Sequence, residues 1–249
     1  MPYTQLDHEK ISDTLSRLQA RVTERFPDRG ISNVCAELLQ ISRQQQANLQ
    51  EISHPHVRLR TLVGLVLAAG LVMIGWGIFQ KVRLLTNNPG EIYSFEGVEA
   101  IVNITLLVSA GVWFLLNLET RIKREQALKG LHQLRSIAHV IDMHQLTKDP
   151  VSPLNLYQRT KSSPERDLTV FQLIRYLDYC AEMLSLTGKL AALYVQTLND
   201  SAVADTVNEI EDLTASLSQK VWQKVMIIRL GITNSETHTA GASNEAPAL

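Results

Sequence analysis

The sequence predicts an all-α membrane protein: a two-helix transmembrane hairpin flanked on both sides by amphipathic helices that form a bundle or coiled coil. Two long runs contain no charged residue, and elsewhere apolar residues recur every three or four positions, which is the helical period. No strand-like alternation of any length interrupts this pattern. The formal net charge of −1 gives no bulk signal for nucleic-acid binding.

Residues 1–55 are expected to form a cytoplasmic helical hairpin. Two amphipathic stretches are separated by Pro27-Asp28-Arg29-Gly30, where proline ends the first helix and glycine supplies a turn. The first stripe of apolar residues is Leu6, Ile11, Leu15, Leu18, Val22 and Phe26, and the second is Ile31, Val34, Leu38, Ile41, Leu49 and Ile52. We expect Ser32 or Asn33 to help cap the second helix, and His54-Pro55-His56 to break it.

Residues 56–120 are expected to hold the membrane hairpin. The predicted spans, about 61–79 and 100–118, would each cover roughly 28 Å as a helix, which matches the apolar thickness of a bilayer. Trp76 and Trp113 suit interfacial positions. The connecting loop, residues 80–99, contains a turn at Asn88-Pro89-Gly90 and is too short to fold as a domain.

The distribution of Lys and Arg predicts the orientation of this hairpin. Basic residues gather outside its two ends, whereas the connecting loop has only Lys81 and Arg83. The positive-inside rule therefore places both termini in the cytoplasm, in an inner membrane if the chain is bacterial. Cys35 and Cys180 would then be reduced, partly buried thiols.

Residues 121–230 are expected to form a C-terminal cytoplasmic helical bundle. The second span should continue as a helix to about Gln145, with Gly130 as its weakest point. After a proline-containing linker, Ser163 and Pro164 read as the start of a helix that ends near Leu198. Its predicted seam is Val170, Ile174, Leu177, Ala181, Leu184, Gly188, Ala191, Val195 and Leu198.

A turn at Asn199-Asp200-Ser201 should cap the last helix, which pairs antiparallel with the one before it. Its predicted seam is Val203, Val207, Ile210, Leu213, Leu217, Val221, Val225 and Ile228. Residues 231–249 have no apolar period, and we expect a disordered tail.

Two groups of polar residues are candidate functional sites. Asn103, Ala110 and Asn117 recur every seven residues and share one helix face inside the second span. They form either an interhelical hydrogen-bonding face or the polar lining of an oligomeric pore. Arg121, Lys123, Arg124 and Lys129 follow that span and are candidate contacts for anionic lipid head groups.

The remaining candidate chemistry is a group of potential ligands, His132, His139, Asp142 and His144. They are consistent with a metal site between protomers, with pH sensing, or with ordinary polar residues of a bundle. None of the common nucleotide-binding, hydrolase or thiol-pair motifs is present. We therefore expect no enzymatic activity, no cofactor and no resident metal.

Two functional hypotheses follow. The first is a non-enzymatic integral membrane protein that contacts lipids and whose cytoplasmic bundle mediates self-assembly or docks a helical protein partner. The second is an oligomeric two-transmembrane channel or membrane effector gated by that bundle. Two spans cannot enclose an aqueous path alone, so the second hypothesis requires an oligomer.

Overall fold

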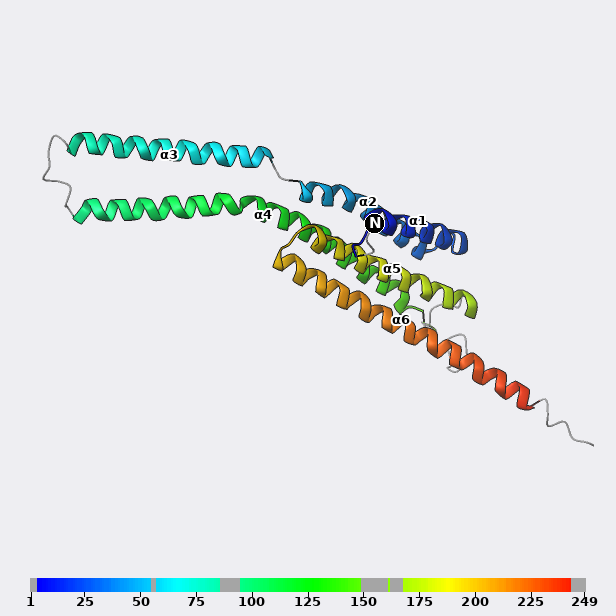
Figure 1. Ribbon diagram of the computed structural model, residues 1–249. Helices are drawn as coiled ribbons and strands as arrows, with labels where there is room; N and C mark the ends of the chain where they lie inside the picture. The colour runs from blue at the N-terminus through cyan, green and yellow to red at the C-terminus, as the bar shows by residue number, and fades with distance from the viewer. Residues whose placement is uncertain (1–3, 55–56, 86–94, 149–160, 162–167, 243–249) are drawn as a thin grey trace, which may run out of the picture. The chain divides into compact units, whose positions relative to one another are not determined.

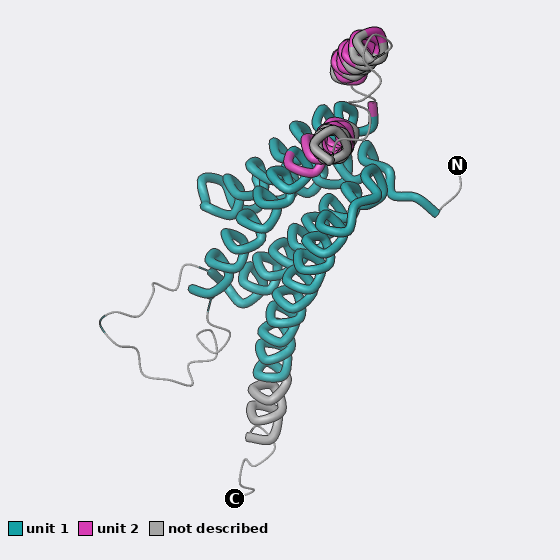
Figure 2. The backbone as a smooth tube through the Cα atoms, turned by 90° about the vertical axis from the view of Figure 1, so that its left-hand side faces the viewer, with its two compact units in different colours: residues 1–53, 126–249 teal, residues 54–125 magenta. Residues whose placement is uncertain are grey.

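The fold was obtained as a computed structural model, which describes residues 4–54, 57–85, 95–148, 161 and 168–242. All the secondary structure of these residues is helical, which confirms the predicted all-α class. The described chain divides into two compact units (Figure 2): residues 1–53 with 126–249, and residues 54–125. The predicted turn at Asn88-Pro89-Gly90 and the predicted cap at Ser163 and Pro164 lie outside the described residues.

The first unit begins with an antiparallel pair, α1 (His8–Arg25) and α2 (Gly30–Ser53). Asp7 caps α1 by accepting a hydrogen bond from the Glu9 backbone N–H at 2.9 Å. The left-handed residue of the turn is Asp28, with φ of 57°, rather than the glycine that the sequence suggested. Gly30 instead begins α2, where a Cβ atom would collide with the imidazole of His144.

The helix α4 (Phe95–Leu146) is continuous and about 78 Å long, as the absence of proline predicted. Its residues from Gln126 onward belong to the first unit, where Leu131, Leu134, Ala138 and Ile141 are buried in the core. Gly130 is also buried there, against the side chain of Tyr194. The glycine therefore allows close packing at this point of the helix.

The helix α5 (Val170–Thr197) lies at the centre of the first unit and contacts α1, α2 and α6 (Figure 1). It begins later than predicted, because Thr169 and Gln172 form a capping box in which each side chain bonds to the other residue's backbone. One residue of the predicted seam, Val195, is 39% exposed, and burial extends to residues outside the seam. Further buried side chains include Tyr176, Tyr179, Cys180, Met183, Leu190 and Tyr194.

The helix α6 (Ser201–Ala242) pairs with α5 through the predicted seam. Within the predicted turn Asn199-Asp200-Ser201, Asp200 caps α6 by accepting from the backbone N–H groups of Ala202 and Val203. The helix continues past Gly231 to Ala242, into the stretch where the sequence predicted a disordered tail. Extending an existing helix needs no new nucleus, and no proline occurs before Pro247.

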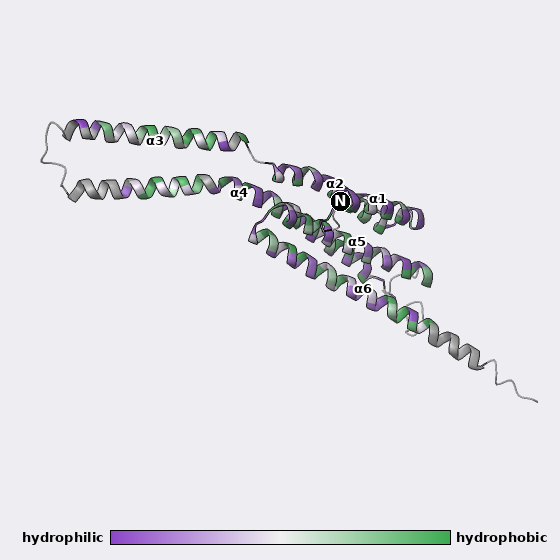
Figure 3. Cartoon of the chain, in the orientation of Figure 1, coloured by the Kyte–Doolittle hydropathy of each residue, from purple (hydrophilic) through white to green (hydrophobic). Residues whose placement is uncertain are grey.

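The second unit consists of α3 (Val57–Leu85) and the part of α4 that precedes Gln126. Figure 3 shows the concentration of apolar residues along α3. In this helix Val63 is buried, whereas large side chains such as Leu65, Val72 and Trp76 are exposed. Most of the apolar side chains that the structure describes in α3 are therefore not covered by the rest of the chain.

Candidate functional site

One helix among the described residues, α3, is long and apolar enough to cross a membrane. Its window Arg60–Gly77 has a mean hydropathy of 1.7, and only 7% of that window is buried within the chain. The second predicted span lies in α4, where Leu107 and Trp113 are similarly exposed, but it is not found as a candidate span. The two-span hairpin of the sequence analysis is therefore not shown.

An ion-pair group joins the two helices of the second unit. The guanidinium of Arg60 on α3 donates to both carboxylate oxygens of Glu119 on α4, from Nε at 2.7 Å and from Nη2 at 3.4 Å. Lys123 lies one turn further along α4, and its Nζ atom is 3.1 Å from Oε1 of the same carboxylate. The Arg60–Glu119 pair therefore links α3 to α4, whereas the Lys123–Glu119 pair lies within α4.

This ion-pair group changes the expected set of head-group contacts. The Lys123 side chain is 12% exposed and already paired with Glu119. Arg121 is exposed, and its guanidinium lies 5.7 Å from the ring centroid of Phe114. Arg124 and Lys129 each have an interaction partner within the chain. Of the four predicted residues, Arg121 and Lys129 are exposed and Lys123 and Arg124 are half-buried, and their contact with lipid head groups stays a prediction.

The predicted polar stripe of α4 is solvent-facing over part of its length. Asn103 and Ala110 are exposed, and Asn117 is half-buried. The Asn117 side-chain amide donates to the carbonyl oxygen of Trp113, four residues earlier in the same helix, at 2.7 Å. Within the chain this amide therefore satisfies part of its hydrogen-bonding capacity on its own helix.

The group of potential metal ligands is not brought together. His132 and His139 are exposed on α4, and Asp142 accepts a hydrogen bond from the Gln145 amide at 2.5 Å. His144 is half-buried against Gly30, where burial, and then the charge of Lys148, lowers its pKa below the ordinary value. No three His, Cys, Asp or Glu residues of the described chain are placed to hold a metal ion.

Polar groups inside the bundle are the features that sequence reasoning missed. Gln45 is buried, and its amide donates to the Leu190 carbonyl of α5 at 2.6 Å. Lys224 of α6 likewise donates to the carbonyl of Gln145 at 2.8 Å. Gln45 occupies the seam between Leu38 and Leu49, so its helical period was the signal that could have revealed its burial.

The two cysteines are free and buried, Cys35 on α2 and Cys180 on α5. Burial is the main cause that raises the pKa of each thiol to about 12. Since the thiolate is the nucleophile and the metal ligand, these residues fit packing positions rather than chemistry.

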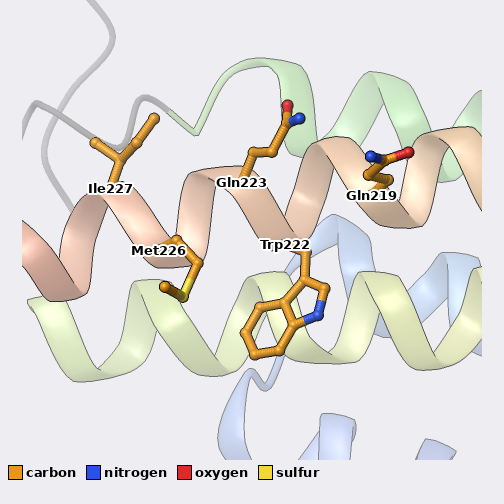
Figure 4. A pocket seen from close by; sticks show the side chains of 5 residues that line it. All are labelled: Gln219, Trp222, Gln223, Met226 and Ile227. Atoms are coloured by element: carbon orange, nitrogen blue, oxygen red, sulfur yellow. The ribbon is translucent and has the colours of Figure 1, made fainter.

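The first unit leaves an apolar strip exposed on α6, which we define as Trp222, Met226, Ile227 and Leu230. Three of these residues, with Gln219 and Gln223, line a hollow on the helix surface (Figure 4). Trp222 and Met226 extend to the same side of α6, whereas Gln223 and Ile227 extend to the other. Arg229 lies 6.0 Å from the Trp222 ring, so a cation borders the strip.

The chain matches no known family model, no curated protein and no solved structure. The candidate functional surfaces are the exposed apolar helix α3, the ion-pair group around Glu119 and the apolar strip of α6.

Proposed function

We propose that the chain is a non-enzymatic integral membrane protein, anchored by an α3–α4 hairpin, whose helical bundle mediates self-assembly or docks a helical partner. The observation that carries the proposal is the exposure of α3, of whose apolar window only 7% is buried. The core helix of a soluble protein has its apolar residues covered by protein, and here the chain does not supply that cover. Lipid would cover such a surface, because a helix satisfies its own backbone groups.

The α4 stretch after Phe95 supports a second span. Leu106, Leu107 and Trp113 are exposed in it, and Glu119 pairs with Arg60 at the beginning of the α3 window. Charged partners at the same end of both helices fit a membrane boundary, with the basic residues on the cytoplasmic side. Both termini are then cytoplasmic, in an inner membrane if the organism is a bacterium.

Membrane extraction tests this proposal. We expect the full chain, expressed in bacterial cells, to resist alkaline carbonate and to dissolve in mild detergent. Leu65→Glu combined with Val72→Glu, both at exposed positions of α3, should weaken insertion because each charge costs about 2.5–3.5 kcal/mol in a span. The matched control places glutamate at two exposed positions of the bundle, Gln133 and Ser136. Release of the unaltered chain by carbonate would contradict the proposal.

Reporter fusions test the orientation. A reporter at residue 249 and one inserted at residues 87–90 should give opposite signals, with the first in the cytoplasm. Matching signals at the two points would contradict the hairpin, because they would be consistent only with a single span or with none.

A second candidate function, the oligomeric channel, is favoured by one observation. Asn103 and Ala110 are exposed on α4 in the single chain, so another copy or water must satisfy the Asn103 amide in a membrane. The mass of the purified chain in detergent discriminates the two candidates, because a monomer cannot enclose a pore. Ion flux in vesicles containing an oligomer would favour the channel.

A further inference from the structure

The part of α4 that belongs to the bundle exposes one face without any Lys, Arg, Asp or Glu. We define this α4 face by the exposed residues between positions 132 and 147, which are His132, Gln133, Ser136, His139, Val140, Met143, Leu146 and Thr147. The two charged residues of the same stretch are engaged within the chain, since Arg135 pairs with Glu209 of α6 and Asp142 accepts from Gln145. Each of the other bundle helices, in contrast, exposes at least two charged residues.

The α4 face also carries exposed apolar side chains at helical spacing. Ser136 and Met143 lie seven residues apart on its midline, with Val140 to one side of that line and Leu146 to the other. Val140, Met143 and Leu146 are 41%, 65% and 58% exposed. This spacing is the pattern with which helices pack along their length. Because a solvated helix face is ordinarily polar and charged, the α4 face fits a contact surface.

We propose that the α4 face is a homodimer interface, in which α4 of one copy packs parallel to α4 of a second copy about a twofold axis along the helix pair. Each midline residue then meets itself: Ser136 lies opposite the second copy's Ser136, and Met143 lies opposite its Met143. The inference rests on the proposed assembly function and names its occupant as a second copy of this chain.

The course of α4 favours a second copy in this orientation. The helix is continuous from Phe95 to Leu146, so it joins the proposed membrane span to the bundle. Two copies anchored in one membrane have the same orientation, and their α4 helices therefore leave the membrane in the same direction. A parallel twofold pair brings identical residues together, so charged residues on its contact face would repel their own copies. The α4 face has none of these charges to oppose the pairing.

The exposed face of α6 does not fit the same arrangement. Asp205 and Asp212 are both exposed and lie seven residues apart on one face of that helix. In a parallel pair of α6 helices each of these carboxylates would approach its own copy, and like charges at an interface are unfavourable. Among the two exposed faces, the α4 face is therefore the one that suits two copies in a shared membrane.

Opposite charges at Met143 test whether this residue meets itself. In the full chain purified in detergent, we expect Met143→Lys and Met143→Glu each to weaken dimerisation by about tenfold or more, because each charge then faces its own copy. A mixture of the two variants should form a heterodimer at least about tenfold more tightly than either variant pairs with itself. A mixture without this gain would overturn the inference, since Met143 would not lie opposite Met143.

A methionine on α6 provides the matched control. Met226 is 47% exposed in the apolar strip, so the same charges can be placed there without entering the core. Met226→Lys and Met226→Glu should each leave the dimer dissociation constant within about twofold of the original value. Weakening by the Met226 variants as large as that by the Met143 variants would overturn the inference, because α6 would then share or form the interface.

Cysteine cross-linking tests the parallel register. Ser136→Cys alone and Met143→Cys alone should each give a disulfide-linked dimer on oxidation, because each position meets its own copy. The native cysteines stay in place because both are buried. The control Ala215→Cys, at an exposed position of α6, should not cross-link. Cross-linking that requires Ser136→Cys and Met143→Cys in the same chain would indicate an antiparallel pair and overturn the inference.

These outcomes separate the inference from the proposed function. A chain that dimerises but ignores the charges at Met143 overturns the α4 interface and leaves self-assembly standing. A chain that is monomeric at every concentration overturns the inference and leaves the docking of a helical partner. A chain released from membranes by carbonate contradicts the proposed membrane anchoring, whatever the Met143 variants do.

Discussion

Gly130 of α4 lies directly against the side chain of Tyr194 of α5, where a Cβ atom added to the glycine would collide with the phenolic oxygen and lie 2.6 Å from Cζ. The tyrosine cannot easily move aside, because its side chain is 1% exposed in the core of the bundle. The glycine therefore sets how closely α4 approaches α5.

The first prediction follows from this contact. Gly130→Ala should lower the free energy of unfolding of the bundle by about 1–2 kcal/mol, because overpacking outweighs the roughly 1 kcal/mol gained in helix propensity. Denaturant unfolding of the full chain in detergent measures the change. Adding Tyr194→Phe should recover part of the loss, since it removes the nearest atom. A Gly130→Ala chain as stable as the original would mean that α4 does not pack on α5 here.

The second prediction concerns the central leucines of the α5–α6 pair. Leu177 and Leu217 are 0% and 4% exposed, and truncation of a buried leucine leaves a cavity. We expect Leu177→Ala or Leu217→Ala to lower the free energy of unfolding by about 2–5 kcal/mol. The matched control is Val195→Ala, at a position 39% exposed on α5, which should cost less than about 1 kcal/mol. Equal losses of unfolding free energy at all three positions would contradict the predicted pairing of α5 with α6.

The sequence predicted those parts of the fold that depend on local pattern. The seam of α6 and the length of α4 follow from the helical period and from the absence of proline, which are both local properties. The start of α5 was placed too early because Ser163 and Pro164 resemble a cap, whereas Thr169 with Gln172 forms the cap observed. Two plausible caps in one sequence cannot be ranked by pattern alone.

What the sequence missed is set by tertiary contacts. The sequence predicted Gly30 as a turn residue and Gly130 as the weakest point of a long helix. In the structure, a side chain from another helix packs closely against each of them. The same limit applies to the candidate sites: Lys123, a candidate contact for lipid head groups, is paired with Glu119 within the chain. Residue spacing in the sequence does not show which neighbouring group a side chain contacts in the fold.

The third prediction concerns pH and His144. Its pKa is lowered from 6.5 in the folded chain, so the unfolded chain binds more protons near that pH. The contribution of neutral His144 to the unfolding free energy is therefore complete above pH 6.5, and it is lost progressively as the pH falls below 6.5. We expect His144→Gln to flatten the decline in unfolding free energy between about pH 7.5 and pH 5.5. His132→Gln, at an exposed position, should leave the decline unchanged. If the unfolding free energy of the His144→Gln chain declined with falling pH as steeply as that of the original chain, the decline could not be assigned to His144.

The fourth prediction concerns the two thiols. With the pKa of Cys35 and of Cys180 raised to about 12, roughly one thiol in ten thousand is ionised at pH 8. A disulfide reagent should therefore react at least about a hundredfold more slowly with the native chain than with the chain in denaturant. Rapid labelling of both cysteines in the native chain would show that the bundle opens around α2 and α5.

The last prediction decides between the two candidate functions through access to Asn103. In the single chain Asn103 is exposed, and Asn117 bonds to its own helix, so contacts outside the chain determine what Asn103 faces in a membrane. We expect those contacts to be other helices, because polar side chains in lipid generally face protein. Asn103→Cys, with Cys35 and Cys180 replaced, should react slowly with a membrane-impermeant thiol reagent. Asn103→Leu should weaken helix association by about 1 kcal/mol without altering ion flux. Rapid labelling of cysteines placed at Asn103, Ala110 and Asn117, with their neighbours protected, would show a water-lined face and favour the channel.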